Sequence, residues 1–363
     1  MTKARQLADL GNAYDDGALS HRNLVINGAM QVAQRGTSFS SADSDIYGVD
    51  RMKYQRSNTS GRVTLSQDAG LAGVSPKSVK IEVTTVAAAT PPSSVFHQHR
   101  YAFEGNDINH LGLGTSDCKD IVLSFYAKAS TTGTLPFGLT NSAGSRSYAN
   151  TFDITEANTW KRYVYKVPPV TDGSWGSGTS SGLELRLGFE YGSNYTGATA
   201  GQWSSMTGFA NFVPTYTNAL ASTLNATLNI TGLQLEVGDT ATPFEHRSYG
   251  DELARCQRYY QALVYTQSQY LPIGFTYNSF QSRLNIPYAQ KRANPTVSFT
   301  GDVKAYYSGT TKDDATLAAE SSGKTSTRVN VSLDNNTNQP SGNAVGVLPV
   351  NSTGLTVSID AEL

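Results

Sequence analysis

The stretch that decides the fold is Leu233–Gln261, LQLEVGDTATPFEHRSYGDELARCQRYYQ. Its first residues, Leu233–Val237, alternate between apolar and polar side chains, as a half-buried strand does. Gly238 breaks this alternation. Asp251 and Glu252 then place two carboxylates where a helix would begin, which suits the positive end of a helix dipole. The change from a period of two to a helical period marks this stretch as the boundary between two β-rich parts.

The helical period predicts a short linking helix over residues 251–261. Leu253 and Cys256 recur on one face and are expected to be buried, whereas Arg255 and Arg258 are expected to face outward. The predicted fold is therefore mainly β, in four parts: an N-terminal leader (1–22), a β-jelly-roll domain (23–250), the linking helix (251–261) and a C-terminal β-sandwich (262–363).

Strands separated by turn residues fill both β-rich parts. Because no helical period interrupts them, they predict antiparallel sheets packed face to face, and in the first part a jelly roll. The strands expected in the first part cover 63–65, 78–83, 121–127, 162–167, 183–189 and 226–237, and those in the second cover 270–278, 283–287, 296–300, 303–307, 328–333 and 355–359.

Charge and hydropathy exclude two kinds of partner. The 28 Lys and Arg residues nearly cancel the 29 Asp and Glu residues, so the chain lacks the basic surface of a nucleic-acid-binding protein. No run approaches the roughly 18 apolar residues of a membrane helix, so no membrane insertion is expected. The opening residues, MTKARQLADL, have no apolar core of the kind found in a secretory signal, which predicts synthesis and retention in the cytosol.

The pattern LQLEVG-x-x-ATPFEHRSYG-x-ELA-x-CQRYYQ resembles a run found in many virion proteins of tailed bacteriophages, tail fibre or structural proteins with a jelly roll similar to carbohydrate-binding modules. Asn23–Gly36 (NLVINGAMQVAQRG) resembles the opening strand of the same domain. Gly48–Arg51 resembles its G-x-D-R step, and Phe103–Lys128 its central strands. Met52 departs from the pattern, because the family commonly has tryptophan after D-R.

The resemblance implies a structural virion protein, made in the host cytoplasm and located on the tail or particle surface. It implies a homotrimer that serves as tail fibre or receptor-binding protein and contacts host surface polysaccharide. A head decoration or head-fibre protein is the first alternative, and a polysaccharide depolymerase is the second. Depolymerases usually have a long parallel β-helix with periodic strands, and no such repeat occurs here, so a non-enzymatic role is expected.

The leader is open to two interpretations. Ala4, Leu7, Ala8 and Leu10 would share one face of a helix about ten residues long, which is marginal in water. It is either a frayed terminus or a peptide that attaches the protein to other phage tail or head proteins.

Two long loops, 171–181 and 191–212, hold the candidate ligand-binding residues. Aromatic side chains offer a flat apolar face and a polar edge, which suits stacking on sugar rings. Trp175 is expected to be exposed, whereas Trp203 and Phe212 are equally suited to filling the core. The candidates for glycan contact are Trp175, Tyr191, Tyr195 and Trp203.

Two residue pairs are candidate metal ligands. His97 and His99 share one face of a strand, where they would bind a metal or face solvent or a subunit contact. Asn27 and Glu236 lie near the first and last strands, where some carbohydrate-binding jelly rolls hold a structural Ca²⁺. Apart from that ion, no cofactor is expected.

Catalytic motifs are weak. Gly178–Gly182 matches G-x-S-x-G, but a loop precedes Ser180 and a strand follows it, which is the wrong context for a nucleophile elbow. Glu184 and Glu190 would share one face of a strand, as surface charges or in a salt bridge.

Overall fold

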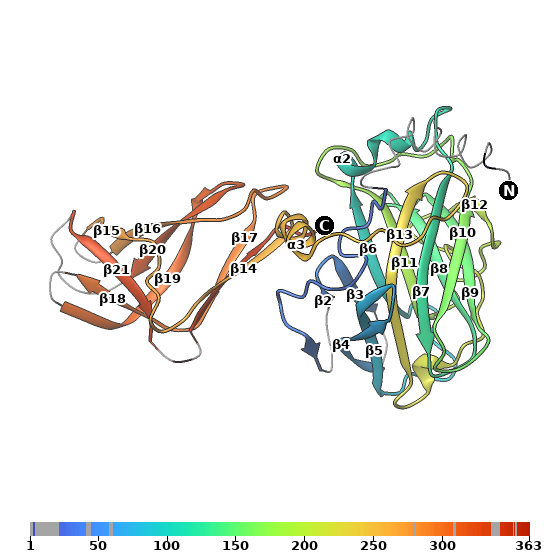
Figure 1. Ribbon diagram of the computed structural model, residues 1–363, viewed down its shortest axis with the longest axis horizontal. Coiled ribbons are helices and arrows are strands. Elements are labelled where there is room, and N and C mark those ends of the chain that lie inside the picture. Colours follow the sequence, from blue (N-terminus) through green and yellow to red (C-terminus); the bar gives the residue numbers. More distant parts are fainter. Residues whose placement is uncertain are drawn as a thin grey trace. The chain divides into compact units, whose positions relative to one another are not determined.

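Strands make up most of the described chain, as the sequence predicts (Figure 1). The computed structural model describes residues 22–40, 45–57, 61–278, 281–307, 310–334, 342–350 and 354–363, together with Lys3 and Ser352. The predicted helical face of the leader lies outside these residues. The chain divides into two compact units, residues 1–252 with Leu363, and residues 253–362. Within the described ranges, no helix is long and apolar enough to cross a membrane.

The N-terminal unit is a sandwich of two antiparallel sheets. One has the strand order β1-β4-β5-β13-β7-β10, and the other β12-β9-β8-β11-β6-β3-β2. In Figure 1 these strands run from blue to yellow and form two layers. The elements are β1 (Ser38–Phe39), β2 (Ile46–Val49), β3 (Met52–Ser57), β4 (Arg62–Leu71), β5 (Ser75–Thr85), β6 (Phe96–Glu104), α2 (Gly105–Ile108), η1 (Asn109–Leu111), β7 (Ile121–Ala129), β8 (Gly133–Asn141), β9 (Arg146–Ile154), β10 (Lys161–Val167), β11 (Ser181–Tyr191), β12 (Gln202–Ser205), η2 (Leu220–Ser222) and β13 (Thr227–Val237).

Alternating strands build the core between these sheets. Leu183, Leu185 and Leu187 of β11 are buried, and they face residues of the other sheet such as Phe125, which is also fully buried. Each such side chain stabilises the fold by roughly 1.5–3 kcal/mol relative to exposure. The six strands predicted in this part are all present, so the predicted sandwich is confirmed.

Residues 23–36 are not a strand, contrary to what the resemblance implied. Asn27 adopts a left-handed conformation with φ of 62°, which breaks extended structure. Its side-chain oxygen accepts from the Val32 N–H, and its amide nitrogen donates to the carbonyls of Val32 and Asp50, all at 2.9 Å. Side-chain hydrogen bonds replace a strand ladder here, so this buried segment still satisfies its polar groups.

The linking helix is displaced from its predicted bounds. Helix α3 spans Tyr249–Gln257 and ends four residues before the predicted end, because Tyr260 already begins strand β14. The Nζ of Lys291 donates to the carbonyl of Gln257, which satisfies an orphan group at the helix end.

The buried face of α3 also differs in part from the prediction. Cys256 is buried as expected, but Leu253 is half-buried and Glu252 is only 6% exposed. Glu252 accepts from the Arg247 guanidinium at 2.9 Å and from the Asn27 N–H at 2.6 Å. An acidic residue at a helix start can therefore be a buried hydrogen-bond partner rather than a solvated charge.

The C-terminal unit is all-β, as predicted, but its larger sheet closes on itself. The strands β15-β16-β20-β19-β18-β21 form a closed barrel, and β14-β22-β17 form a three-stranded sheet, where the sequence predicted a sandwich. Ile286, Val331 and Val357 are among its fully buried side chains. The strands are β14 (Tyr260–Tyr265), β15 (Gly274–Thr276), β16 (Gln281–Pro287), β17 (Thr296–Thr300), β18 (Val303–Tyr307), β19 (Thr310–Lys324), β20 (Arg328–Asp334), β21 (Ala344–Pro349) and β22 (Leu355–Asp360).

Candidate functional site

The aromatic residues predicted to contact a ligand separate into two pairs. Trp175 and Trp203 lie together, with ring centroids 5.6 Å apart and planes at 88°, and Trp203 also packs on Tyr148. Both indoles are half-buried against the core of the N-terminal unit, so Trp175 is not the exposed residue that the sequence suggested. Their N–H groups donate to the carbonyls of Asp172 and Pro168. These bonds fix the pair and leave parts of the ring surfaces exposed.

The second pair lies in a satellite cluster built by loop 191–212. The ring of Tyr191 is 3% exposed and lies over Gly188 of β11, and its hydroxyl donates to Gln98 Oε1 at 2.7 Å. Burial raises the pKa of the Tyr191 hydroxyl. Tyr195 is half-buried and packs edge-on against Phe96. Tyr191 therefore fills space beside the sheet and offers no face for a sugar.

Any side chain at position 188 should destabilise the fold because of this packing. A Cβ at this position would lie 1.9 Å from the Tyr191 ring, so Gly188→Ala is expected to displace the ring and cost roughly 1–3 kcal/mol of unfolding free energy. Urea unfolding followed by tryptophan fluorescence measures this cost. If the ring is the cause, adding Tyr191→Ala should recover part of the loss, and a double variant whose losses simply add would contradict the explanation.

The two glutamates of β11 face opposite ways, contrary to the prediction that they share a face. The register of β11 against β6 shifts between Gly188 and Glu190, which places Glu190 opposite His97. Glu190 Oε2 lies 3.4 Å from His97 Nδ1, and the His97 ring packs on Phe189 in the core, 5.2 Å between centroids. A β-bulge of this kind turns a side chain toward the other face.

Glu184 remains on the outer face, where it is buried between two guanidinium groups. Its carboxylate accepts from Arg100 and Arg186, and Arg186 stacks on the ring of Phe209 at 4.3 Å. Burial alone would raise the pKa of Glu184, but the hydrogen bonds and charges of the two arginines hold that pKa below its usual value. This is a structural ion-pair network covered by loop 191–212.

His97 and His99 are buried, so the alternative in which they face solvent is wrong. Both are 1% exposed and lie beside the ring of Tyr54, at 5.9 and 6.4 Å between centroids. Burial lowers the pKa of His97 to about 3, with a smaller contribution from the positive charges of Arg56 and Arg62, and burial lowers that of His99 to about 4. In the part of the chain that the structure describes, no group of three His, Cys, Asp or Glu residues is arranged to hold a metal ion.

Lowering the pH should reduce the unfolding free energy of the N-terminal unit already at pH values well above those at which carboxylates titrate. The unfolded chain binds a proton at each histidine near the ordinary pKa of 6.5, whereas the folded chain does so only near 3 and 4. Above pH 6.5 both rings are neutral in the folded and in the unfolded chain, so the unfolding free energy does not depend on them. Below pH 6.5 the unfolding free energy falls by up to about 1.4 kcal/mol per pH unit for each ring. Unfolding free energies at pH 7 and pH 5 measure the loss. A His97→Leu/His99→Leu variant should lose most of this dependence, and an unchanged slope in that variant would contradict the assignment.

Asn27 and Glu236 are not brought together as ion ligands. The Glu236 carboxylate accepts from the Thr242 N–H at 2.9 Å, the Thr242 hydroxyl at 2.7 Å and the Gln234 amide at 3.0 Å. The Asn27 side-chain oxygen is engaged with Val32, as described above. The oxygens proposed for Ca²⁺ therefore serve as hydrogen-bond acceptors for two separate segments of the chain.

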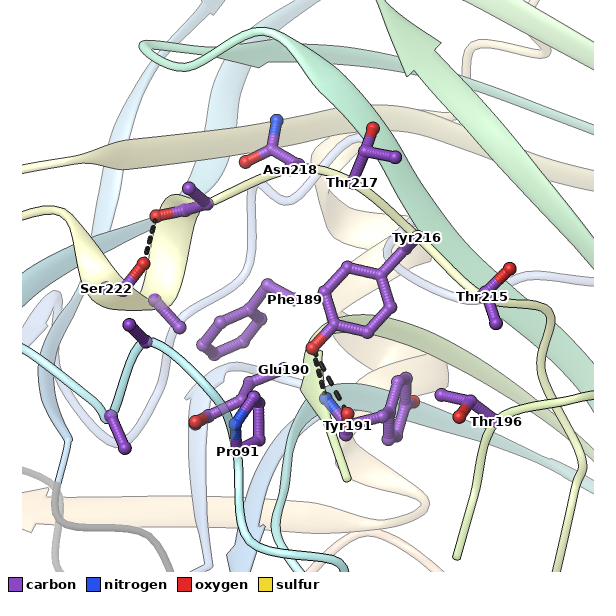
Figure 2. A pocket seen from close by; sticks show the side chains of 14 residues that line it. Pro91, Phe189, Glu190, Tyr191, Thr196, Thr215, Tyr216, Thr217, Asn218 and Ser222 are labelled. Carbon is purple, nitrogen blue, oxygen red and sulfur yellow. Dashed lines mark hydrogen bonds between the residues drawn. The ribbon is translucent and has the colours of Figure 1, made fainter. Parts of the chain in front are cut away.

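The N-terminal unit contains a cavity of about 310 Å³ that no motif predicted. It lies between residues 88–91, the end of β11 and residues 215–222, and Figure 2 shows the Tyr216 ring among its lining side chains. Its polar lining residues include Glu190, Thr196, Thr215 and Thr217. Phe189, Pro91 and several alanines supply the apolar walls.

Hydrogen bonds hold the rim of the cavity in place. The Tyr216 hydroxyl accepts from the Tyr191 N–H at 2.9 Å and donates to its carbonyl at 3.2 Å (Figure 2). The Asn218 side chain donates to the Thr131 carbonyl at 2.9 Å and accepts from the Thr131 hydroxyl and the Leu220 N–H. The rim is therefore preorganised, which reduces the entropy cost of binding a ligand.

The cavity and the tryptophan pair lie at opposite ends of strand β8. Thr217 bonds to Thr134 near the start of β8, whereas Tyr148, which contacts Trp203, is opposite Leu139 near its end. Five residues of strand correspond to roughly 17 Å. Ligand-binding sites typically occupy about 300–1,000 Å³ and combine apolar walls with a few polar groups, so the cavity rather than the tryptophan pair has the form of such a site.

Comparisons with known proteins add fold-level similarities. No family model matches the chain, and no curated protein matches its sequence. A bacteriophage CBA120 tailspike protein 4 enzymatically active domain is 13% identical, with a TM-score of 0.32, and the match covers 60% of this chain and 22% of that one. A family 11 carbohydrate-binding module of Clostridium thermocellum is 10% identical, with a TM-score of 0.28, and the match covers 58% and 98%. The module TmCBM61 in complex with β-1,4-galactotriose is 10% identical, with a TM-score of 0.28, and the match covers 60% and 99%.

The matched region spans only 22% of the tailspike domain. At identities of 13% or less and TM-scores of 0.32 or less, the function of this chain has to be inferred from its own residues.

Proposed function

We propose that this chain is a non-enzymatic virion protein of a tailed bacteriophage whose N-terminal unit binds polysaccharide on the host surface. The observation that carries the proposal is the cavity beneath Tyr216, whose lining combines threonine, alanine and aromatic residues. The sequence resemblance of residues 23–261 to phage virion proteins supports the biological setting. A tail fibre or receptor-binding protein is the role that joins the two.

The lining suits one sugar residue of a longer chain. Tyr216, which is half-buried, supplies apolar ring surface, against which the C–H face of a sugar packs. Thr196 and Thr215 also line the cavity, and their side chains carry hydroxyl groups. Such groups bind and orient a sugar without a bond being broken.

A depolymerase is the less favoured alternative. Retaining and inverting glycosidases use two carboxyl groups about 5–10 Å apart, and the described lining of the cavity includes one, Glu190. Head decoration remains the structural alternative. We further propose a homotrimer, in which residues 1–22 attach the protein to other tail or head proteins.

Binding of purified host surface polysaccharide to the full chain tests the proposed function. We expect saturable binding by biolayer interferometry without release of reducing ends. In electron micrographs of intact particles, we expect a gold-labelled antibody against the protein to bind to the tails or fibres. Binding with release of reducing ends would replace the proposal by the depolymerase. Labelled heads without polysaccharide binding would replace it by head decoration.

A further inference from the structure

We infer that copies of this chain associate through the outer face of strand β15 in the C-terminal unit, with Ile273, Phe275 and Tyr277 at the centre of the contact. The inference rests on the homotrimer of the proposed function and assigns the surface that holds it together. It does not depend on the cavity beneath Tyr216, because that cavity lies in the other unit.

Exposed apolar side chains are concentrated in one segment of the chain. Among the described residues, nine large hydrophobic side chains are exposed, and four of them, Tyr270, Ile273, Phe275 and Tyr277, lie within eight consecutive residues. Apolar residues scattered singly over a surface are normal, whereas a contiguous group marks a site of interaction. Residues 270–277 are therefore the segment of the described surface most suited to being covered by a partner.

The alternation of the strand places three of these side chains on one face. Ile273, Phe275 and Tyr277 are 79%, 51% and 48% exposed. The residues between them, Gly274 and Thr276, are buried. Because successive side chains of a strand point to opposite faces, the three exposed side chains stand together on the outside of the barrel.

The neighbouring strand β21 extends this apolar patch. Phe275 is opposite Ala344 in the register, and Ala344 is small and exposed. The ring of Tyr270 covers Gly346 of the same strand, 3.0 Å from where a Cβ would be. Protruding rings beside a small side chain give a surface that the rings of a second copy can pack against, as a well-packed protein contact requires.

The chemistry of the patch favours a protein partner over a sugar or an added strand. Ile273, its most exposed member, has neither the flat face nor the polar edge on which a sugar stacks. Strand β15 is hydrogen-bonded to β16 on one side and to β21 on the other, so it offers no open edge to a further strand. The patch is bordered by Arg283, which lies 3.6 Å over the Tyr277 ring, and tyrosine and arginine are both enriched in protein contacts.

Charge and area suit a copy of the same chain. Arg283 is paired with Glu320 at 2.9 Å, so two copies that meet here do not oppose unpaired guanidinium groups. An aromatic side chain presents about 150–250 Å², so at about half exposure the rings of Tyr270, Phe275 and Tyr277 leave roughly 250–400 Å² open. With Ile273, this approaches half of the roughly 800 Å² that each partner buries in a stable contact, and the residues around the patch would supply the rest.

Sedimentation of the full chain tests the inference. We expect wild-type protein to sediment as a trimer at micromolar concentration. Ile273→Asp/Phe275→Asp should raise the concentration needed for association at least about 100-fold, because charges without partners are costly to bury. Both side chains point outward, so circular dichroism and thermal melting of the dissociated variant should show an intact fold.

Two further variants make the test specific. Val86→Asp/Val164→Asp is the matched control, because both valines are exposed, at 43% and 48%, and the change in net charge is the same. This control should remain a trimer. Ala344→Arg introduces a large charged side chain at the position opposite Phe275 and should also weaken association, which keeps the inference testable if the first variant does not fold.

The outcomes separate this inference from the proposed function. If wild-type protein is an oligomer and the patch variants remain oligomers, the inference is overturned and another surface holds the copies together. If the control dissociates as far as Ile273→Asp/Phe275→Asp does, net charge rather than the patch sets association, and the inference is again overturned. If wild-type protein is a monomer at these concentrations, both the inference and the homotrimer fail, whereas binding of polysaccharide by the N-terminal unit is decided by its own experiment.

Discussion

Replacing Ala88 by tryptophan should abolish polysaccharide binding and leave the fold intact. Ala88 is an exposed residue that lines the cavity, so an indole at this position can enter it without displacing the core. Because the cavity measures only about 310 Å³, the indole should exclude a sugar ring. We expect at least about 100-fold weaker binding, since all contacts inside the cavity are lost together, and a change in unfolding free energy within about 0.5 kcal/mol. Interferometry with purified polysaccharide and urea unfolding measure the two effects.

Val86→Trp is the matched control for this variant. Val86 precedes the cavity-lining residues in the same loop and is 43% exposed, but it does not line the cavity. Its replacement should leave binding unchanged. Equal binding by the Ala88 variant and wild type would place the sugar elsewhere, and the Trp175–Trp203 pair would be the next position to test.

Removing the carboxylate of Glu184 should give the largest loss of stability. Glu184→Ala would leave the guanidinium groups of Arg100 and Arg186 buried together without their shared partner. Breaking a buried ion pair in this way costs about 3–5 kcal/mol. The three tryptophans of the chain, at positions 160, 175 and 203, all lie in the N-terminal unit. Their fluorescence during urea unfolding therefore reports this unit alone.

Two further variants identify the cause of that loss. Replacing Glu184, Arg100 and Arg186 together by apolar residues of similar volume should restore most of the stability, because no charge is then left buried. Glu82→Ala, which removes a surface pair with Lys80, should cost less than about 1 kcal/mol. If Glu184→Ala costs no more than Glu82→Ala, the network is not a structural element of the sheet.

Strands were predictable where alternation alone decides the structure. In β11, Leu183, Leu185 and Leu187 show a period of two, and the structure buries all three as that period requires. The C-terminal unit shows the limit of this reasoning. Alternation assigns one face of a strand to the core, but it does not say whether a sheet closes on itself, which depends on pairings such as that of β15 with β21.

Departures from regular structure were the least predictable. The bulge that turns Glu190 inward leaves no signal in the alternation of β11, so Glu184 and Glu190 were expected on one face. The burial of His97 did have a signal. His97 shares a face with Tyr101 and Phe103, which both lie in the core, and the same period of two could have placed it there.

The cavity was beyond prediction because its walls come from segments far apart in sequence. Residues 88–91 and 215–222 are separated by about half of the N-terminal unit, and neither contains a recognisable motif. The chemistry of aromatic side chains favoured the residues of loop 191–212 as ligand contacts, but the Tyr191 ring covers Gly188. A ligand role requires an accessible ring, which sequence alone does not reveal.

A crystal structure of the full chain with an oligosaccharide cut from the host polysaccharide would test the central claim most directly. We predict density for a sugar residue in the cavity beneath Tyr216, with a ring face against Tyr216 and a hydroxyl within hydrogen-bond distance of a lining threonine. Density for the sugar on the Trp175–Trp203 pair or on the C-terminal unit, with the cavity empty, would contradict it.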